Sequence, residues 1–376
     1  MRIGIDAKRI FHNATGLGNG NRTLIQMLID HHPEHDYVLF TNGIKINPHI
    51  RGNTEVYKYT GAFKGLWRSR GIAKDLIKKH IDLFVGPSNE IPFTLKNIDM
   101  PSIVLMHDII FKRYPNQYPL FDRVIYDLKS RYACKHATHI VAASETTKQD
   151  IIEYYNISPD RISVIYQSCD ASYFQSLNRY QKQTVKDKYA LPEKFILNVG
   201  SVIERKNLLN VCKAYLQIPE AERIPVVVIG KGKEYEKLVK DFIRINNLEQ
   251  WFVFLTNVPN ADLPPIYHLA EFTIYPSYCE GFGIPVLESM VCGVPVITSN
   301  ISSMPEVAGD AAIYFDPYNT QSIADAIMQV HKNPDLRNKM IEKGKIQVKK
   351  FTGSDLSDQW NRVFRKVNSE QQRISA

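Results

Sequence analysis

The chain has 376 residues, 44% of them hydrophobic and 23% charged, with a formal net charge of +8. This length predicts about two to three domains, and the composition is typical of a globular protein with large buried cores. We predict neither a membrane span nor a signal peptide, because no run of about 18 apolar residues occurs and the first residues lack an apolar core. The five scattered cysteines form no Cys-x-x-Cys pair, which argues against disulfides or a zinc site and favours a cytoplasmic location. The positive charge alone allows nucleic acid, anionic lipid or phosphorylated ligands as partners.

In the first half of the chain, short apolar strands alternate with helical stretches. We expect strands at 3–7, 37–41, 83–85, 102–106, 139–142 and 163–165. After the first strand, a Gly-rich loop at 16–20 precedes a helix at 21–30, whose apolar residues recur at helical spacing. Strands that alternate with helices predict a parallel sheet with helices on both faces.

The same alternation starts again in the second half. We expect strands at 195–199, 225–229, 252–255, 272–275 and 294–298. Their uniformly apolar character is typical of sheets that are buried on both faces. The polar stretch 176–188 is predicted to be a linker between domains at 1–178 and 189–355, and a C-terminal helix at about 356–376 is expected to pack back on the first domain. The predicted fold class is α/β, with two doubly wound Rossmann-like domains that face a cleft, and ligands are expected beyond the carboxyl ends of the strands.

Two glutamates lie close to one predicted helix start in the second half. A strand ends near Tyr275, a loop with two glycines carries Glu280, and Glu288 follows soon after Pro285, a residue type favoured in the first helical turn. Free amide groups at a helix N-terminus bind anions, so the site suits a phosphorylated ligand whose hydroxyls the carboxylates would hold. Acidic residues also favour helix N-termini in their own right, and the spacing alone does not separate these two interpretations.

The run from Glu280 to Glu288 resembles the Glu-x7-Glu motif of family-4 retaining glycosyltransferases, which have the GT-B fold. The Pro-Ser pair at 276–277 and the stretches 291–297 and 304–311 match the same family. The similarity covers nearly the whole chain and is strongest from about 195 to 317.

The resemblance also implies roles for individual residues of this segment. Glu280 would contact the transferred sugar, and Glu288 would contact the ribose of the donor. The backbone of three neighbouring residues would approach the sugar and the diphosphate, namely Phe282, Gly283 and Ile284. The same resemblance implies retention at the anomeric carbon.

An adjacent Arg205 and Lys206 follow the strand at 195–199. Such a pair can neutralise a diphosphate; the alternative is a solvated basic pair, although cations are disfavoured at a helix start. The resemblance implies that the pair stabilises the departing nucleoside diphosphate, with Arg205 replacing an arginine that many members carry where this chain has Ser201. No Asp-x-Asp occurs in the sequence. We therefore expect these cations to neutralise the diphosphate, and we expect neither a metal nor another cofactor.

Further candidates lie on both halves of the chain. The loop at 16–20 begins too far after the first strand for a dinucleotide-binding turn, and a flexible loop is the alternative interpretation. In similar enzymes this loop closes over the donor phosphate, which assigns Gly16 and Gly18 to donor binding. His107, directly after the strand at 102–106, resembles a catalytic histidine beside the reacting sugar, and a hydrogen-bonded structural histidine is the alternative. Val258 completes the donor-binding set.

The segment 64–79 is strongly basic and has apolar side chains within and beside it. Its charged residues are Lys64, Arg68, Arg70, Lys74, Asp75, Lys78 and Lys79, and its larger apolar neighbours include Phe63, Leu66 and Trp67. A basic helix with aromatic neighbours can lie on an anionic membrane surface. A solvated helix is the alternative.

The predicted reaction moves a hexosyl group, with mannose favoured, from a GDP- or UDP-linked sugar to a hydroxyl of a glycan or lipid-linked acceptor. This preference follows from a likeness to bacterial mannosyltransferases of surface polysaccharide assembly, and it places the protein in the cytoplasm or peripherally on the inner face of the membrane. A GT-B nucleotide-sugar 2-epimerase is the main alternative. A nicotinamide dehydrogenase lacks support because the glycines are misplaced, and no nucleic-acid-binding motif is present.

Overall fold

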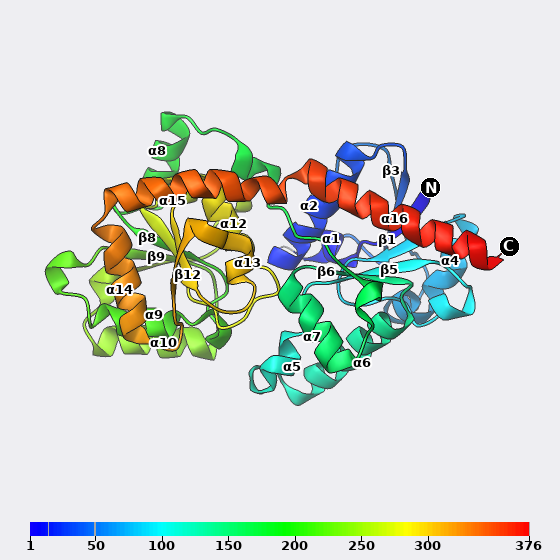
Figure 1. The fold of residues 1–376 in the computed structure, drawn as a ribbon, viewed down its shortest axis with the longest axis horizontal. Coiled ribbons are helices and arrows are strands. Elements are labelled where there is room, and N and C mark those ends of the chain that lie inside the picture. The colour runs from blue at the N-terminus through cyan, green and yellow to red at the C-terminus, as the bar shows by residue number, and fades with distance from the viewer. Residues whose placement is uncertain (14, 49, 376) are drawn as a thin grey trace. The chain divides into compact units, whose positions relative to one another are not determined.

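The computed structural model describes residues 1–13, 15–48 and 50–375, the last four of these by their backbone only. The chain divides into two compact units, one formed by Met1–Asp170 with Phe351–Ala376 and the other by Ala171–Lys350 (Figure 1). The second unit thus begins earlier in the chain than the expected domain limits of 178 and 189.

The first unit is built on a parallel sheet of seven strands in the order β3-β2-β1-β4-β5-β6-β7. The strands are β1 (Arg2–Asp6), β2 (Asp36–Thr41), β3 (Thr54–Lys58), β4 (Leu83–Gly86), β5 (Ser102–Met106), β6 (His139–Ala142) and β7 (Ile162–Val164). Successive side chains of a strand point to opposite faces. Leu105 therefore joins the core on one face of the sheet, and Met106 joins the core on the other.

Helices cover both faces of this sheet, as expected. They are α1 (Lys8–His12), α2 (Gly16–His31), α4 (Ile72–Lys78), α5 (Ile110–Arg113), α6 (Leu120–His136), α7 (Glu145–Tyr155) and α16 (Gly353–Ser375). The C-terminal α16 packs along α2 (Figure 1), and its apolar side chains enter the core on that face. The largest of these side chains are Trp360 and Phe364, which are 2% and 0% exposed.

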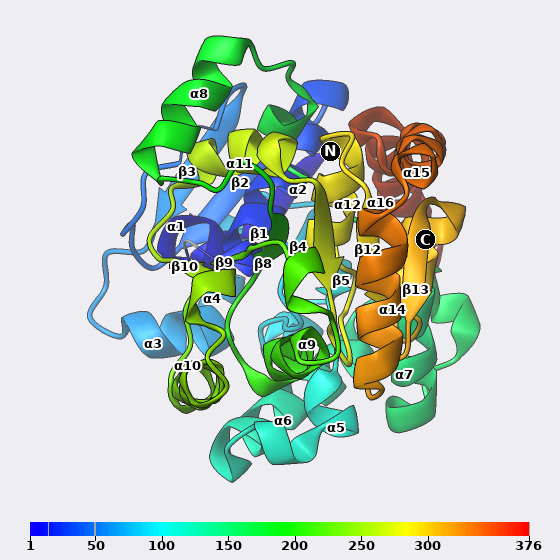
Figure 2. The ribbon, with the colours of Figure 1, turned by 90° about the vertical axis from the view of Figure 1, so that its left-hand side faces the viewer.

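The second unit has a parallel sheet of six strands in the order β10-β9-β8-β11-β12-β13. The strands are β8 (Ile196–Val199), β9 (Val226–Ile229), β10 (Phe252–Leu255), β11 (Phe272–Tyr275), β12 (Val296–Ser299) and β13 (Ala312–Phe315). The helices are α8 (Arg179–Lys188), α9 (Leu208–Tyr215), α10 (Glu234–Ile245), α11 (Leu263–Leu269), α12 (Ile284–Val291), α13 (Met304–Ala308), α14 (Thr320–His331) and α15 (Pro334–Gln347). Helices α9 and α14 lie side by side (Figure 2). The α/β class and both doubly wound sheets are therefore confirmed.

The prediction of a linker at 176–188 is wrong, because most of this stretch forms α8. Asn178 caps the helix, accepting a hydrogen bond from the backbone N–H of Gln181, whose side chain in turn accepts one from the Asn178 backbone. Lys188 then forms an ion pair of 2.6 Å with Asp262, just before α11. Only Val185 of this helix is buried, so its sequence carries little of the apolar periodicity that would predict a helix.

We expect Phe364→Ala to destabilise the first unit by about 3–5 kcal/mol, the usual cost of removing a buried phenylalanine ring. The neighbouring Arg365→Ala is the matched control, because Arg365 is exposed on the same turn of α16. Urea unfolding followed by circular dichroism measures both variants. Equal midpoints for the two would contradict the docking of α16 on the first sheet.

Candidate active site

The central strands of the second sheet create a natural binding position. The first strand of this unit, β8, lies between β9 and β11, so the strand order reverses direction between β8 and β11. In open parallel sheets, ligands bind beyond the carboxyl ends of the strands at such a reversal. The segments 200–207 and 276–283 leave the sheet at these two strand ends. They carry the predicted Arg205, Lys206 and Glu280.

These three side chains converge on one carboxylate oxygen. Glu280 Oε1 lies 2.7 Å from Arg205 Nη1 and 2.6 Å from Lys206 Nζ. The side chains of Arg205, Lys206 and Glu280 are 14%, 17% and 10% exposed. Arg205 also donates to the carbonyl of Cys279 at 2.5 Å, and Lys206 donates to the hydroxyl of Tyr275. The structure therefore brings the predicted acid and both predicted cations into one cluster, which we call the Glu280 triad.

The triad keeps Glu280 ionised. Burial by itself would raise the pKa of this carboxyl, but the charges and hydrogen bonds of Lys206 and Arg205 outweigh burial and lower the pKa to about 2. The carboxylate is thus an anion whose charge two neighbouring cations share. Within residues 1–13, 15–48 and 50–375, no cluster of three or more His, Cys, Asp or Glu side chains has the geometry to hold a metal ion.

Two further residues, Asn207 and Ser303, fix the loops that carry the triad, and neither was identified as functional from the sequence. Asn207 has the left-handed backbone (φ 59°) that asparagine tolerates. Its side-chain amide donates to the carbonyls of Pro276 and Pro317 at 3.0 and 2.8 Å. The hydroxyl of Ser303 lies 3.0 Å from the carbonyl of Glu280. For Asn207, the one signal in the sequence is its place directly after Arg205 and Lys206. For Ser303, nothing in the sequence indicates its contact with the loop that carries Glu280.

The glycine-containing turn before α12 has the geometry that its sequence predicts. Gly283 has φ 113°, a conformation that residues with a side chain rarely adopt, and Ile284 begins α12 immediately afterwards. Phe282 is buried and its carbonyl accepts from Ser303 at 2.7 Å. Glu288 lies one turn further along and accepts a hydrogen bond of 2.7 Å from the hydroxyl of Tyr267. Their predicted contacts with sugar, diphosphate and ribose stay predictions.

Val258 lies at the same edge of this sheet, beyond β10, and is partly buried. Because β10 and β8 are separated by β9 alone, both strands direct their carboxyl ends to one side. The predicted donor-binding role of Val258 is compatible with this position and stays a prediction.

The expected Gly-rich loop at 16–20 is instead the start of a helix. Helix α2 begins at Gly16 and runs for 16 residues. A Cβ atom at Gly18 would come within 1.9 Å of the carbonyl oxygen of Asn13, so only glycine fits there. Gly16 has no such constraint. The glycine at 18 thus permits close packing of the chain before α2. The donor-binding roles predicted for Gly16 and Gly18 stay predictions.

His107 lies at the carboxyl end of β5, where the sequence predicted it, and other residues hold its ring. Gln167 Nε2 donates to His107 Nδ1 at 2.9 Å, and His107 Nε2 lies 2.9 Å from the carbonyl of Pro87. These partners assign the proton to Nε2, and burial lowers the pKa of the ring. Both nitrogens of a neutral imidazole are therefore engaged, as in a positioned polar residue.

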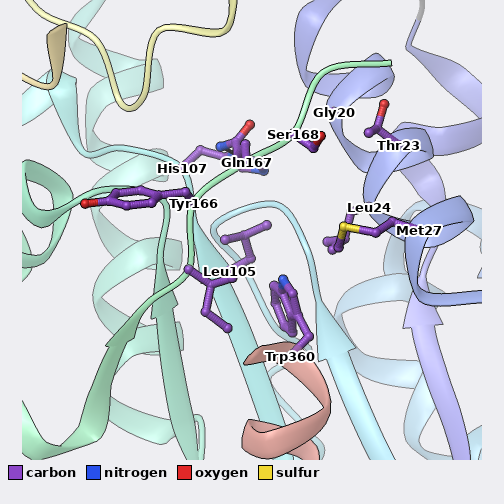
Figure 3. A pocket seen from close by; sticks show the side chains of 11 residues that line it. Gly20, Thr23, Leu24, Met27, Leu105, His107, Tyr166, Gln167, Ser168 and Trp360 are labelled. Atoms are coloured by element: carbon purple, nitrogen blue, oxygen red, sulfur yellow. Dashed lines mark hydrogen bonds between the residues drawn. The ribbon is translucent and has the colours of Figure 1, made fainter. Parts of the chain in front are cut away.

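A pocket of the first unit opens beside His107 (Figure 3). It is lined by Gly20, Thr23, Leu24, Met27, Leu105, His107, Ile165, Tyr166, Gln167, Ser168 and Trp360. Apolar side chains form its floor, while Thr23, Gln167 and Ser168 provide polar groups. Such a mixed lining suits a ligand with both apolar faces and hydroxyls.

Two family models match the chain in sequence. The model described as "Glycosyltransferase Family 4" matches residues 16–173, and the model described as "Glycosyl transferases group 1" matches residues 181–347. The O-antigen chain mannosyltransferase B of Escherichia coli is 31% identical over 281 residues, which are 74% of this chain and 72% of that protein. The chain belongs to the family-4 glycosyltransferases.

A longer relative also matches the chain in sequence, and a solved structure shares its fold. A serotype-specific mannosyltransferase WbdA of Escherichia coli is 29% identical over 262 residues, and the matched region spans 67% of this chain but only 32% of that protein. The crystal structure of Anabaena HepE in complex with UDP and glucose has a TM-score of 0.74 at 17% identity and covers 97% of this chain and 99% of that chain. This likeness confirms the GT-B fold of the glycosyltransferase.

The segment 64–79 of the glycosyltransferase is helical, as expected, but it is not a regular α-helix throughout. It is α3 (Lys64–Leu66), a π-helical turn (Trp67–Gly71) and α4. Trp67 is 4% exposed and donates to Asp75 at 2.5 Å, while Arg68 forms an ion pair of 2.6 Å with Asp6. Trp67 is thus buried and Arg68 is mostly covered, because the polar groups of both side chains find partners inside the unit.

We expect Glu280→Gln to lower the free energy of unfolding by about 3 kcal/mol at neutral pH, the order of the cost of breaking a buried ion pair. The stabilisation by ionised Glu280 is present above its ordinary pKa of 4.5 and is lost as the pH falls toward 2. The difference from wild type should therefore stay constant between about pH 5.5 and 8. Urea unfolding at several pH values measures it.

The matched control is Glu342→Gln, because Glu342 pairs with Lys345 at 2.7 Å but is 69% exposed. This change should have little effect on stability. If the gap between wild type and Glu280→Gln narrowed steadily from pH 8 to 5.5, the lowered pKa of Glu280 would be wrong.

Proposed function

We propose that this glycosyltransferase moves a mannosyl group from a nucleoside-diphosphate mannose to a hydroxyl of a glycan or lipid-linked acceptor, with retention of anomeric configuration. The observation that carries the proposal is the Glu280 triad at the strand reversal of the second sheet. The mannosyltransferase names of the relatives support mannose as the sugar. We propose GDP as the favoured base, with UDP as the next candidate.

In the proposed reaction, Arg205 and Lys206 bind the diphosphate. Each can give a charge-assisted hydrogen bond to a phosphate oxygen. Both contact Glu280, which lies in the loop just before α12, and the N-terminus of a helix favours a bound anion. As the glycosidic bond to the diphosphate breaks, negative charge grows on the leaving oxygen. Preorganised cations stabilise this charge most strongly in a site with little water. Two cations in place also support turnover without a metal ion, which we include in the proposal.

Glu280 is the proposed holder of the sugar hydroxyls. A retaining double displacement would need a carboxylate that attacks the anomeric carbon. Oxygen Oε1 of Glu280 is engaged by two cations, which makes the carboxylate a poor nucleophile and a good hydrogen-bond acceptor. We therefore favour attack by the acceptor on the face from which the diphosphate leaves, with a diphosphate oxygen taking the acceptor proton.

The pocket beside His107 is the proposed acceptor side. His107 is a neutral ring held by Gln167 and Pro87, so we assign it to positioning the reacting groups and not to removing a proton. In the described part of the chain, no helix is both long and apolar enough to cross a bilayer. We propose that the enzyme acts in the cytoplasm and peripherally on the inner face of the membrane, where a lipid-linked acceptor would lie.

Lys206→Ala should lower kcat by about 100-fold or more, by analogy with the loss of one preorganised group that stabilises developing charge. Lys213→Ala is the matched control, since Lys213 is exposed on α9, and it should keep wild-type turnover. Transfer of radiolabelled mannose to acceptor measures both. A near-normal rate for folded Lys206→Ala would remove this lysine from the mechanism.

A thermal-shift screen with GDP, UDP and ADP identifies the base, because a ligand that binds only the native state raises the melting temperature. We expect the largest shift with GDP and the same shift when EDTA is present. A shift that EDTA abolishes would contradict metal independence.

Incubation with the favoured nucleotide-mannose alone should leave the sugar unchanged, and formation of its 2-epimer would indicate an isomerase instead.

A further inference from the structure

Helix α6 presents a row of large apolar side chains to solvent. Leu120, Phe121, Val124 and Leu128 are 65%, 74%, 57% and 62% exposed. At 3.6 residues per turn, their positions fall within about 100° of the helix circumference. A contiguous row of this kind on a soluble surface marks a docking site more often than single exposed residues do. We call these four residues the α6 stripe.

The α6 stripe lies on the side of the helix away from its buried residues. The opposite side of α6 buries Ser130, Ala133 and Cys134 against the rest of the unit. Near the C-terminal end, Tyr132 donates to the carbonyl of Phe93 at 2.7 Å. The helix is thus anchored on its inner side, and its outer side is presented as a rigid surface.

Cations continue the stripe along the same side of the helix. Arg131 and Lys135 follow Leu128 by three and seven residues, so they fall within the same arc, and both are exposed. Arg131 has a long 3.5 Å ion pair with Asp127 and lies 5.2 Å from the ring centre of Tyr155. From 110 to 136 the sequence holds six lysines and arginines and two aspartates. The surface is therefore apolar at one end and positively charged at the other.

This combination defines the partner. The apolar end requires a partner that can accept large side chains, and the charged end requires an anionic one. A bilayer with anionic headgroups has both properties in one surface, with acyl chains beneath the phosphates. A second copy of this chain would instead bring a surface of the same positive sign.

We propose that α6 docks the enzyme on an anionic lipid bilayer, with the α6 stripe inserted at the headgroup boundary and Arg131 and Lys135 against lipid phosphates. The docking deepens the proposed function and rests on it for the presence of a lipid-linked acceptor. It also moves the membrane contact away from the segment 64–79, where Trp67 is buried and Arg68 is paired with Asp6.

The test is co-sedimentation of the full chain with vesicles of phosphatidylglycerol and phosphatidylethanolamine, and with vesicles of phosphatidylcholine. Phe121→Ser/Leu128→Ser should lower the partition coefficient on anionic vesicles at least about tenfold, because two large side chains no longer leave water. Arg131→Ser/Lys135→Ser should remove most of the preference for anionic vesicles. The matched control is Phe63→Ser/Leu66→Ser, an exposed apolar pair of the same unit, which should change binding by less than about twofold.

Three results would overturn the proposal. The first is wild type that stays in solution with anionic vesicles. The second is loss of binding by the control pair while the α6 variants keep it. The third is an oligomer in light scattering that Phe121→Ser/Leu128→Ser dissociates. The melting-temperature shift with GDP and UDP, measured on every variant, distinguishes a failure of the docking proposal from a failure of the proposed function. The shift should be the same in wild type and the α6 variants. Its absence in wild type would count against the donor and not against the docking surface.

Discussion

The sharing of one buried carboxylate by two cations is the interaction on which the second unit's site depends. Taking three charges out of water is costly unless each finds a partner at hydrogen-bond distance. The adjacent Arg205 and Lys206 come from one loop, and Glu280 comes from another. Both loops must therefore be held closely in place. This explains why the side chains of buried Asn207 and Ser303 donate hydrogen bonds to backbone carbonyls of the loop that carries Glu280.

The same interaction shapes how a donor would be bound under the proposed function. A diphosphate offers oxygens to the cations that Glu280 already engages, so the carboxylate and the phosphate share the same positive charge. The carboxylate keeps the two cations close together before the reaction, and this preorganisation lowers the reorganisation required when charge moves to the leaving group. Glu280 then has an electrostatic role as well as its proposed role in holding the sugar.

The strands were largely predictable because a parallel sheet buried on both faces requires apolar runs, and all of the expected strands lie within two residues of their predicted limits. The exceptions have physical causes. Strands β3 and β13 were not predicted, and each lies at an edge of its sheet. Strand β3 is half-exposed with Glu55 and Lys58 in it, so its sequence resembles a loop, and β13 has only four residues, two of them partly exposed. Helix α8 buries only Val185 and is specified by its cap. At the site, the motif predicted Glu280 and Arg205, but Asn207, Ser303 and Gln167 act through contacts between distant segments that sequence spacing does not show.

The two basic segments of the first unit, 64–79 and α6, show that composition alone does not decide which segment can contact a membrane. Both 64–79 and α6 combine cations with aromatic and aliphatic residues, and the first has the denser charge. Their difference lies in the direction of the side chains. In the first segment a π-helical turn directs Trp67 to Asp75 and Arg68 to buried Asp6. In α6 a regular helix is anchored by small residues such as Ser130 and Ala133, which leaves its large apolar residues outside. A membrane surface can only meet side chains that the fold has not already used, and by that criterion α6 is the better candidate.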